Sequence, residues 1–382
     1  MKHTYILFVF LLAALFARSQ PYPVGTMTVI YTDSSRSNRQ VTADIYFPAL
    51  TSGGSVLAND SFPFVVFGHG FQMQTVDYTP FVDSLIPRGY ILAFSNTENS
   101  LQPSHPDFAK DLTFIYNKLI SEHTNAASPF YQHVIARGAI GGHSMGGGCT
   151  LLSIQYSEPA LCYFGFAEAN TNPSAQTAST HMTRPYLSFA GSEDCIAPYG
   201  VHQKPTYDSC ASPCKVLIEI TGASHCQFDA SNSICNLGET VSGCANPPMS
   251  RTDQINMVMG YLQPYLDHHL KGLSSASASF DSVYIADNVN TKATNCAGLP
   301  NGIENLSAQG ISVYPNPANG VLYIKSDQEV SEVKLIDQLG QQIVSVNAPD
   351  GKINVTAISA GIYTIEVITR NGQSSFFKIV RE

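Results

Sequence analysis

Short apolar runs alternate with stretches of helical periodicity from Gly25 to about Gly272. The first two runs, Met27–Tyr31 and Val41–Phe47, alternate apolar and polar residues, which is typical of antiparallel edge strands. Five later runs are short and almost wholly apolar: Phe64–Phe67, Ile91–Phe94, Ala139–Gly141, Tyr186–Ala190 and Val216–Ile220. Strands that helices cover on both faces have this composition, so these runs predict a mostly parallel sheet.

Stretches with helical periodicity separate these runs. Four of them predict helices: Tyr78–Arg88, Phe108–His123, Met145–Tyr156 and Arg251–Leu270. Strands and helices in alternation indicate an α/β fold, in which helices cover both faces of the sheet in a three-layer sandwich. We expect this domain to span residues 20–272.

The chain changes character after Gly272. Residues 273–310 are mostly small and polar, which predicts an extension that begins packed on the first domain and ends as a linker. From Ile311 to Glu382, apolar runs are separated by Asn-Gly, Leu-Gly and Asp-Gly pairs that favour turns. This pattern predicts a small all-β sandwich of about seven strands over residues 311–382.

Residues 1–19 have the pattern of a signal peptide. Lys2 and His3 precede an apolar run from Tyr5 to Phe16, and Ala17-Arg18-Ser19 offers small residues for cleavage. The run has ~12 residues, fewer than the ~20 that a membrane-spanning helix needs. We expect cleavage after Ser19 and secretion.

Composition narrows the class of protein. Hydrophobic residues make up 44% of the chain and aromatic residues 10%, enough for a large core, which excludes wholesale disorder. Only 13% of residues are charged, about half the usual share in soluble proteins. The formal net charge of −9 offers no basic field for phosphate backbones, so nucleic-acid binding is not expected. We expect an exported monomer.

The nine cysteines of an exported chain should be largely oxidised, and their odd number leaves at least one unpaired in a monomer. Metal binding is the competing interpretation. No CxxC pair occurs, and the close pairs Cys210/Cys214 and Cys235/Cys244 lack the flanking histidine of a zinc site. We therefore predict no metal and no other cofactor.

The segment Gly142-His143-Ser144-Met145-Gly146 matches G-x-S-x-G between a predicted strand and a predicted helix. Such a sharp turn needs glycine two positions before and after the serine, because larger side chains would meet the strand or the helix. The serine oxygen then projects at a helix N-terminus, where developing negative charge is stabilised. Ser144 is the predicted nucleophile.

A nucleophilic serine needs a base and an acid that orients it, and in this fold they follow in the order Ser, Asp or Glu, His. Asp194 and His225 each follow a predicted parallel strand at its carboxyl end, where open α/β sheets place their sites. Glu193 is a rival acid and His69 a rival base. The alternative roles are a turn residue for Asp194 and a structural loop residue for His225.

The oxyanion hole should combine two backbone N–H groups. The N–H of Met145 follows the nucleophile directly. The loop Gly68-His69-Gly70-Phe71-Gln72 follows the strand at Phe64–Phe67, and the N–H of Phe71 is the second candidate. We interpret His69, His143, His268 and His269 as supporting or solvated residues.

These segments together resemble the α/β-hydrolase superfamily, and within it bacterial cutinase-like and polyester hydrolases and the related dienelactone-hydrolase and chlorophyllase-like esterases. The resemblance rests on Gly142–Gly148, Ser192–Pro198 and Gly222–His225 and covers about Pro23 to Gly272. It implies that Ser144, Asp194 and His225 form a triad, that Phe71 and Met145 are the oxyanion residues, and that the substrate is an ester.

Two features qualify the resemblance. Cys195 follows the predicted acid and Cys226 the predicted base, so a Cys195–Cys226 disulfide would clamp the two loops if the triad forms; two unrelated bridges are the alternative. Polyester hydrolases of this kind usually have a tryptophan in the loop that corresponds to Ala167–Asn172, but this chain has none. Phe71, Phe166 and nearby tyrosines are candidates to replace it.

The tail resembles the type A C-terminal sorting domain of the type IX secretion system. The matching residues are Val313-Tyr314-Pro315-Asn316-Pro317, Gly320, Asp337, Gly340, Gly361-Ile362-Tyr363 and Lys378-Ile379-Val380. The resemblance implies a Bacteroidota-type source, export by the type IX machinery and removal of the domain. A carbohydrate- or protein-binding sandwich is the alternative.

The sequence therefore predicts a secreted serine hydrolase that cleaves carboxylic esters. A cutinase-like polyester hydrolase is the narrower alternative. The alternative of another class is a catalytically inactive surface binding or adhesion protein on a hydrolase scaffold.

Overall fold

The computed structural model describes residues 21–297 apart from residue 245, residue 299, and residues 311–381 apart from 316–317, 327, 338–341, 348–350 and 371–373. The predicted signal peptide, residues 1–19, lies outside the described residues. Asn316, Pro317 and Gly340 of the sorting-domain resemblance lie outside them as well.

A nine-stranded sheet forms the centre of the larger domain, in the order β1-β2-β4-β3-β5-β6-β7-β8-β9. Its six central strands run parallel: β4 (Ile91–Ser95), β3 (Phe62–Gly68), β5 (Val134–His143), β6 (Cys162–Phe166), β7 (Tyr186–Gly191) and β8 (Lys215–Ile220). Antiparallel strands β1 (Val24–Asp33) and β2 (Arg39–Pro48) lie at one edge and β9 (Thr291–Thr294) at the other. The predicted mostly parallel sheet is confirmed, with β6 and β9 as additional strands.

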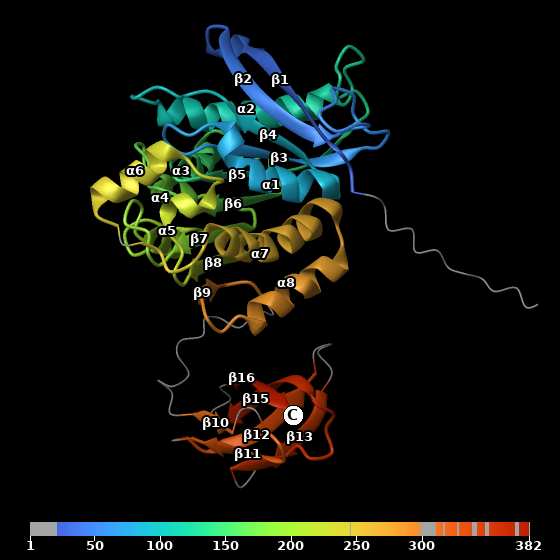
Figure 1. Ribbon diagram of the computed structural model, residues 1–382, viewed down its shortest axis with the longest axis vertical. Helices are drawn as coiled ribbons and strands as arrows, with labels where there is room; N and C mark the ends of the chain where they lie inside the picture. The colour runs from blue at the N-terminus through green and yellow to red at the C-terminus, as the bar shows by residue number, and fades with distance from the viewer. Residues whose placement is uncertain are drawn as a thin grey trace, which may run out of the picture.

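Helices cover both faces of this sheet (Figure 1). On one face, side chains such as Phe64 and Val66 share a core with α2 (His105–Glu122), α3 (Met145–Leu152) and α4 (Ala175–Ser179), and α5 (Gln203–Ser209) packs beside α4. On the other face, Val65 and Phe67 share a core with α1 (Thr79–Leu85), α7 (Arg251–Lys271) and α8 (Ser274–Ala286). Successive residues of β3 thus enter opposite cores, which explains its unbroken apolar run.

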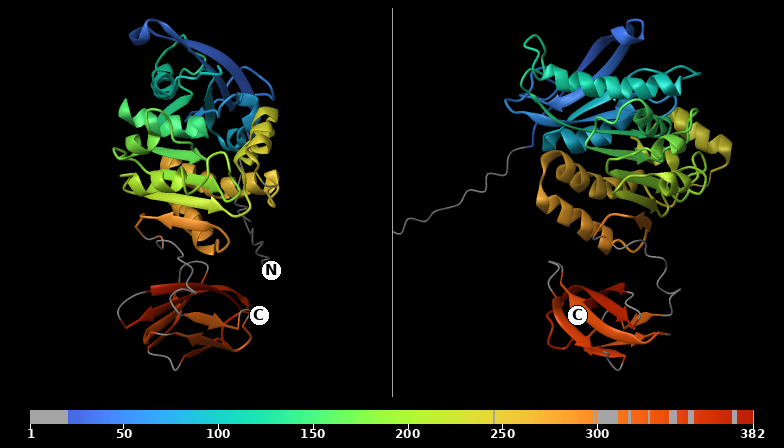
Figure 2. Two further views of the ribbon diagram at one scale, coloured as in Figure 1. Left: turned by 90° about the vertical axis from the view of Figure 1, so that its left-hand side faces the viewer. Right: turned by 180° about the vertical axis from the view of Figure 1, so that it is seen from behind.

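The segment after Gly272 contributes to the same domain. Phe280 and Tyr284 of α8 are buried in the core that includes α7, and β9 pairs with β8. Figure 2 shows α8 and β9 beside the rest of the larger domain from two further sides.

The described C-terminal residues form two antiparallel sheets with a core of their own. One sheet contains β10 (Ser312–Tyr314), β11 (Val321–Lys325) and β14 (Lys352–Asn354), and the other contains β13 (Gln342–Asn347), β12 (Val330–Ile336), β15 (Gly361–Thr369) and β16 (Ser374–Arg381). The prediction of a small all-β domain is confirmed.

Candidate active site

Ser144 lies at a tight turn between β5 and α3. Its backbone angles, φ 53° and ψ −118°, are unusual for a residue with a side chain. The turn is possible because a Cβ on Gly142 would lie 2.4 Å from the carbonyl carbon of Gly146, and one on Gly146 would lie 2.1 Å from the carbonyl oxygen of Gly68. Both glycines therefore allow backbone contacts that any other residue would prevent.

Two loops at the carboxyl ends of β7 and β8 bring Asp194 and His225 together. Nδ1 of His225 lies 2.7 Å from Oδ2 of Asp194, and both side chains are buried. The other oxygen of Asp194 accepts hydrogen bonds from the N–H groups of Ile196 and Ala197 at 2.9 and 2.7 Å. These bonds fix the carboxylate, so His225 meets a rigid acceptor that orients its ring.

The rival acid and the rival base occupy other positions. The carboxylate of Glu193 accepts a hydrogen bond from the hydroxyl of Ser192, whereas its neighbour Asp194 contacts His225. His69 is buried with its ring nitrogens 2.8 Å from the carbonyl oxygens of Gly70 and Thr97. His69 therefore braces the loop after β3.

Two backbone N–H groups are available beside the turn. In the described part of the chain, neither the N–H of Phe71 nor that of Met145 donates a hydrogen bond to another group. Met145 is the first residue of α3, so its N–H has no partner within the helix. Each of these donors is therefore free to bind an anion.

His143 lies at the centre of a buried network that sequence reasoning missed. Its Nε2 lies 3.1 Å from the carbonyl oxygen of His225, so Nε2 donates, and Nδ1 accepts from the hydroxyl of Tyr78 at 3.0 Å. The same hydroxyl accepts the N–H of Gly70 at 2.8 Å. Burial, and then the nearby His225, hold the pKa of His143 well below its usual value. A neutral His143 thus connects the turn, the His225 loop and the loop after β3.

The comparison with protein families agrees with this arrangement. A sequence model of the PET hydrolase-like family matches residues 12–262, more than half of the chain. The chain belongs to the PET hydrolase-like family. A model of the secretion system C-terminal sorting domain matches residues 312–382. No curated protein matches the chain.

These matches settle two of the broader predictions. The protein is an α/β hydrolase, as its sheet and its family both indicate. Its C-terminal domain directs it through the type IX secretion machinery to the extracellular space or the cell surface. No helix in the described part of the chain is long and apolar enough to cross a membrane.

In this PET hydrolase-like protein, two histidines hold the loop at Ala167–Asn172, where related polyester hydrolases usually have a tryptophan. The N–H of Asn170 donates to Nδ1 of His202 at 3.0 Å, and the N–H of Asn172 donates to Nδ1 of His105 at 3.1 Å. Of the two phenylalanines that could replace it, Phe166 is fully buried, whereas 46% of the Phe71 surface is exposed. Phe71 alone of this pair can contact a substrate.

Glu168 packs beside the turn between β5 and α3. Oε1 accepts hydrogen bonds from the hydroxyls of Tyr186, at 2.6 Å, and Ser188, and the residue is almost fully buried. Burial raises the pKa of this carboxyl group. Its β-carbon lies where a side chain on Gly147 would have to go, so Glu168 packs directly against the start of α3.

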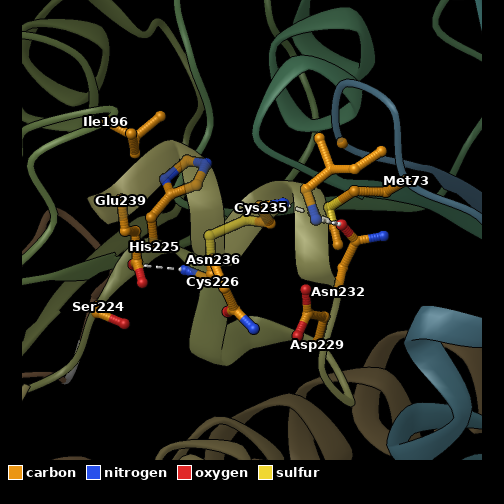
Figure 3. The surroundings of a disulfide bond; sticks show 12 residues. Met73, Ile196, Ser224, His225, Cys226, Asp229, Asn232, Cys235, Asn236 and Glu239 are labelled. Atoms are coloured by element: carbon orange, nitrogen blue, oxygen red, sulfur yellow. Dashed lines mark hydrogen bonds between the residues drawn. A yellow bond between two sulfur atoms is a disulfide. The ribbon is translucent and has the colours of Figure 1, made fainter. Parts of the chain in front are cut away.

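The predicted Cys195–Cys226 disulfide is wrong. Cys195 pairs with Cys244 and Cys226 pairs with Cys235, so both cysteines are bridged, but to opposite ends of one segment. That segment holds α6 (Ser233–Ser242), a helix that the periodicity analysis missed. The loops that hold Asp194 and His225 are therefore each tied to the α6 segment rather than to one another. Figure 3 shows the Cys226–Cys235 bridge.

The remaining cysteines complete the pairing. Cys214 and Cys296 form a third disulfide, which ties the segment before β8 to the segment after β9. Cys149, Cys162 and Cys210 are free and buried. Among the residues that the structure describes, no group of three or more His, Cys, Asp or Glu side chains could hold a metal ion.

Proposed function

We propose that the protein is a secreted serine hydrolase that cleaves carboxylic esters through an acyl-enzyme. The observation that carries the proposal is the 2.7 Å contact between the buried side chains of His225 and Asp194. It lies at the carboxyl ends of the parallel strands, where the turn between β5 and α3 also holds Ser144. The unpaired N–H groups of Phe71 and Met145 support it, because acyl transfer needs donors for a developing oxyanion.

In the proposed mechanism, the Ser144 oxygen attacks the ester carbonyl while Nε2 of His225 takes its proton. The tetrahedral oxyanion accepts hydrogen bonds from Phe71 and Met145. Collapse breaks the ester bond, and His225 returns the proton to the departing alcohol. Water then attacks the acyl-serine with His225 again as base, which releases the acid and restores Ser144. Asp194 holds Nδ1–H of His225 and stabilises the imidazolium formed in each half-reaction.

A polyester is the narrower candidate substrate, and the family match favours it. The half-exposed Phe71, in the predicted oxyanion loop itself, supports contact with an aromatic or aliphatic repeat unit. The absence of tryptophan argues for a surface that differs from that of other polyester hydrolases. Release of soluble products from a polyester film would separate this candidate from a general esterase.

The first test is hydrolysis of p-nitrophenyl esters from acetate to palmitate by the chain from Gln20 to Glu382. Ser144→Ala should lower kcat by about 10⁴-fold or more, because no other nucleophile replaces the hydroxyl. Ser121→Ala, on the outer part of α2, is the matched control and should keep full activity. Equal activity of the Ser144 variant and the native protein would refute the proposal.

A fluorophosphonate label separates the enzyme from an inactive binding protein. Labelling of the native chain that disappears in Ser144→Ala indicates an activated serine. Activity that survives a chelator would further separate this mechanism from a metal-dependent hydrolase. A folded protein without labelling or ester hydrolysis would leave the adhesion alternative.

A further inference from the structure

Helix α6 presents its apolar side chains to solvent. Ile234, Leu237 and Val241 are spaced three and four residues apart, so they share one face of the helix. Their exposed fractions are 51%, 60% and 75%, and no residue of α6 is buried. An ordinary surface helix of a globular protein turns its apolar face toward the core, so α6 is inverted.

Covalent and polar contacts, rather than apolar burial, hold the opposite face of α6. Cys235 is bonded to Cys226, and the carboxylate of Glu239 accepts the N–H of Cys226 at 2.9 Å. Asn232 caps the helix and also donates to the carboxylate of Asp77 at 2.8 Å. Figure 3 shows the Cys226–Cys235 disulfide, with Glu239 near His225 and Asn232 at the other side of the view, near Met73. The chain thus fixes α6 firmly while leaving its apolar face uncovered.

The α6 segment adjoins the loops that carry Asp194 and His225. Cys226 directly follows His225, and Cys195, which is tied to the end of α6, directly follows Asp194. Ile196, whose N–H donates to Asp194, lies 3.9 Å from the position that a Cβ on Gly238 would take, and it is itself partly exposed. A surface that covers α6 would therefore lie beside the predicted catalytic groups.

Charge and size limit what can cover this face. Residues 233–242 contain no lysine or arginine, and Glu239 is turned inward, so α6 lacks the cations that draw helices to anionic membrane surfaces. A ten-residue helix is about 15 Å long and about 10 Å wide. Such a stripe is small against the roughly 800 Å² per partner of a stable protein interface. An extended, uncharged apolar surface can contact this stripe without forming a protein interface of that size.

We propose that the face formed by Ile234, Leu237 and Val241 docks the enzyme onto the uncharged surface of an insoluble ester, with the candidate active site beside the contact. This inference rests on the proposed ester hydrolysis. The substrate is then a solid or aggregated ester whose chains reach Ser144 from the surface on which α6 rests.

The test compares two triple variants of the chain from Gln20 to Glu382. Ile234→Gln, Leu237→Gln and Val241→Gln together remove the apolar face and keep a good helix former at each position. Ile30→Gln, Leu101→Gln and Val289→Gln together are the matched control, since these side chains are also exposed but lie outside α6. Circular dichroism and thermal melting first establish that both variants fold.

Adsorption to polycaprolactone particles is measured with Ser144→Ala added to each protein, so that binding does not depend on catalysis. We expect the α6 variant to bind at least about tenfold more weakly and the control to bind within about twofold of the parent. With Ser144 present, polycaprolactone hydrolysis should fall about tenfold in the α6 variant while p-nitrophenyl acetate hydrolysis stays within about twofold.

Several outcomes would overturn the docking proposal. Equal adsorption of the two triple variants would do so directly. Sedimentation that finds a native dimer and a monomeric α6 variant would assign the face to self-association. Binding to phosphatidylcholine vesicles that exceeds binding to the particles, and is lost in the α6 variant, would assign it to membranes. If adsorption depends on α6 but the native protein cleaves neither ester, docking stands and the proposed function fails.

Discussion

Glu193 and Asp194 are neighbouring carboxylates with different surroundings, and a pair of variants can separate their roles. Asp194→Asn should lower kcat by about 10⁴-fold, because the amide no longer stabilises the imidazolium and favours the wrong tautomer of His225. Glu193→Gln should change kcat less than about threefold, because Glu193 contacts Ser192 rather than His225. Steady-state kinetics with p-nitrophenyl acetate measure both, and a reversed order would identify Glu193 as the acid.

His143 should make the folded protein sensitive to acid. Its pKa lies well below the usual 6.5, so below that pH the unfolded chain binds a proton that the folded chain does not. His143 leaves the free energy of unfolding unchanged above pH 6.5. Below pH 6.5, it lowers that free energy by about 1.4 kcal/mol for each pH unit. In His143→Phe, the free energy of unfolding should therefore fall less steeply between pH 6.5 and pH 5 than in the native protein.

Tyr78→Phe is the control for this prediction. It removes the hydroxyl that donates to His143 and should cost about 1–3 kcal/mol, because His143 and the N–H of Gly70 lose a buried partner. It should leave the pH dependence parallel to that of the native protein, since His143 stays buried and still binds its proton only in the unfolded chain. Urea unfolding at several pH values measures all three proteins, and parallel curves for His143→Phe would refute the assignment.

Among the elements, two of the three disulfides should differ in what they stabilise. Cys214–Cys296 closes a loop with a sequence separation of 82 residues, so Cys214→Ser with Cys296→Ser should cost about 4–5 kcal/mol. Cys226–Cys235 closes a separation of only 9 residues, so its removal should cost about 2–3 kcal/mol. The first change should leave kcat close to native, whereas the second should lower it, because Cys226 follows the predicted base. Equal effects on kcat would contradict this division.

The elements also show what a sequence can and cannot reveal. The turn at Ser144 was predictable because glycine, strand and helix signals are adjacent in the chain. The contact of Asp194 with His225 followed from strand order, since both residues end parallel strands. Disulfide partners depend on long-range packing, and α6 was missed because three apolar residues in a ten-residue helix give only a weak periodic signal. The network of His143 depends on Tyr78, 65 residues away, and no local pattern indicates it.

At the scale of the whole molecule, the structure changes where the catalytic domain should be cut. A chain that ends at Gly272 loses α8, β9 and the partner of Cys214, and exposes the edge of β8. A chain that ends at residue 299 keeps all of these. We expect the longer fragment to melt close to the native temperature with native p-nitrophenyl acetate activity, and the shorter one to be unstable or insoluble. Equal melting temperatures would show that α8 and β9 are dispensable.

The placement of the cysteines ties assembly of the protein to its location in the cell. The two bridges that anchor α6 can persist only where thiols are oxidised, which is outside the cytoplasm. Before export, α6 has no covalent attachment to the loops of Asp194 and His225. Preparations made in a reducing host should therefore contain nine titratable thiols instead of three, with a largely complete sheet and an unanchored α6. The formation of these disulfides after export thus determines when α6 becomes fixed to the loops of Asp194 and His225.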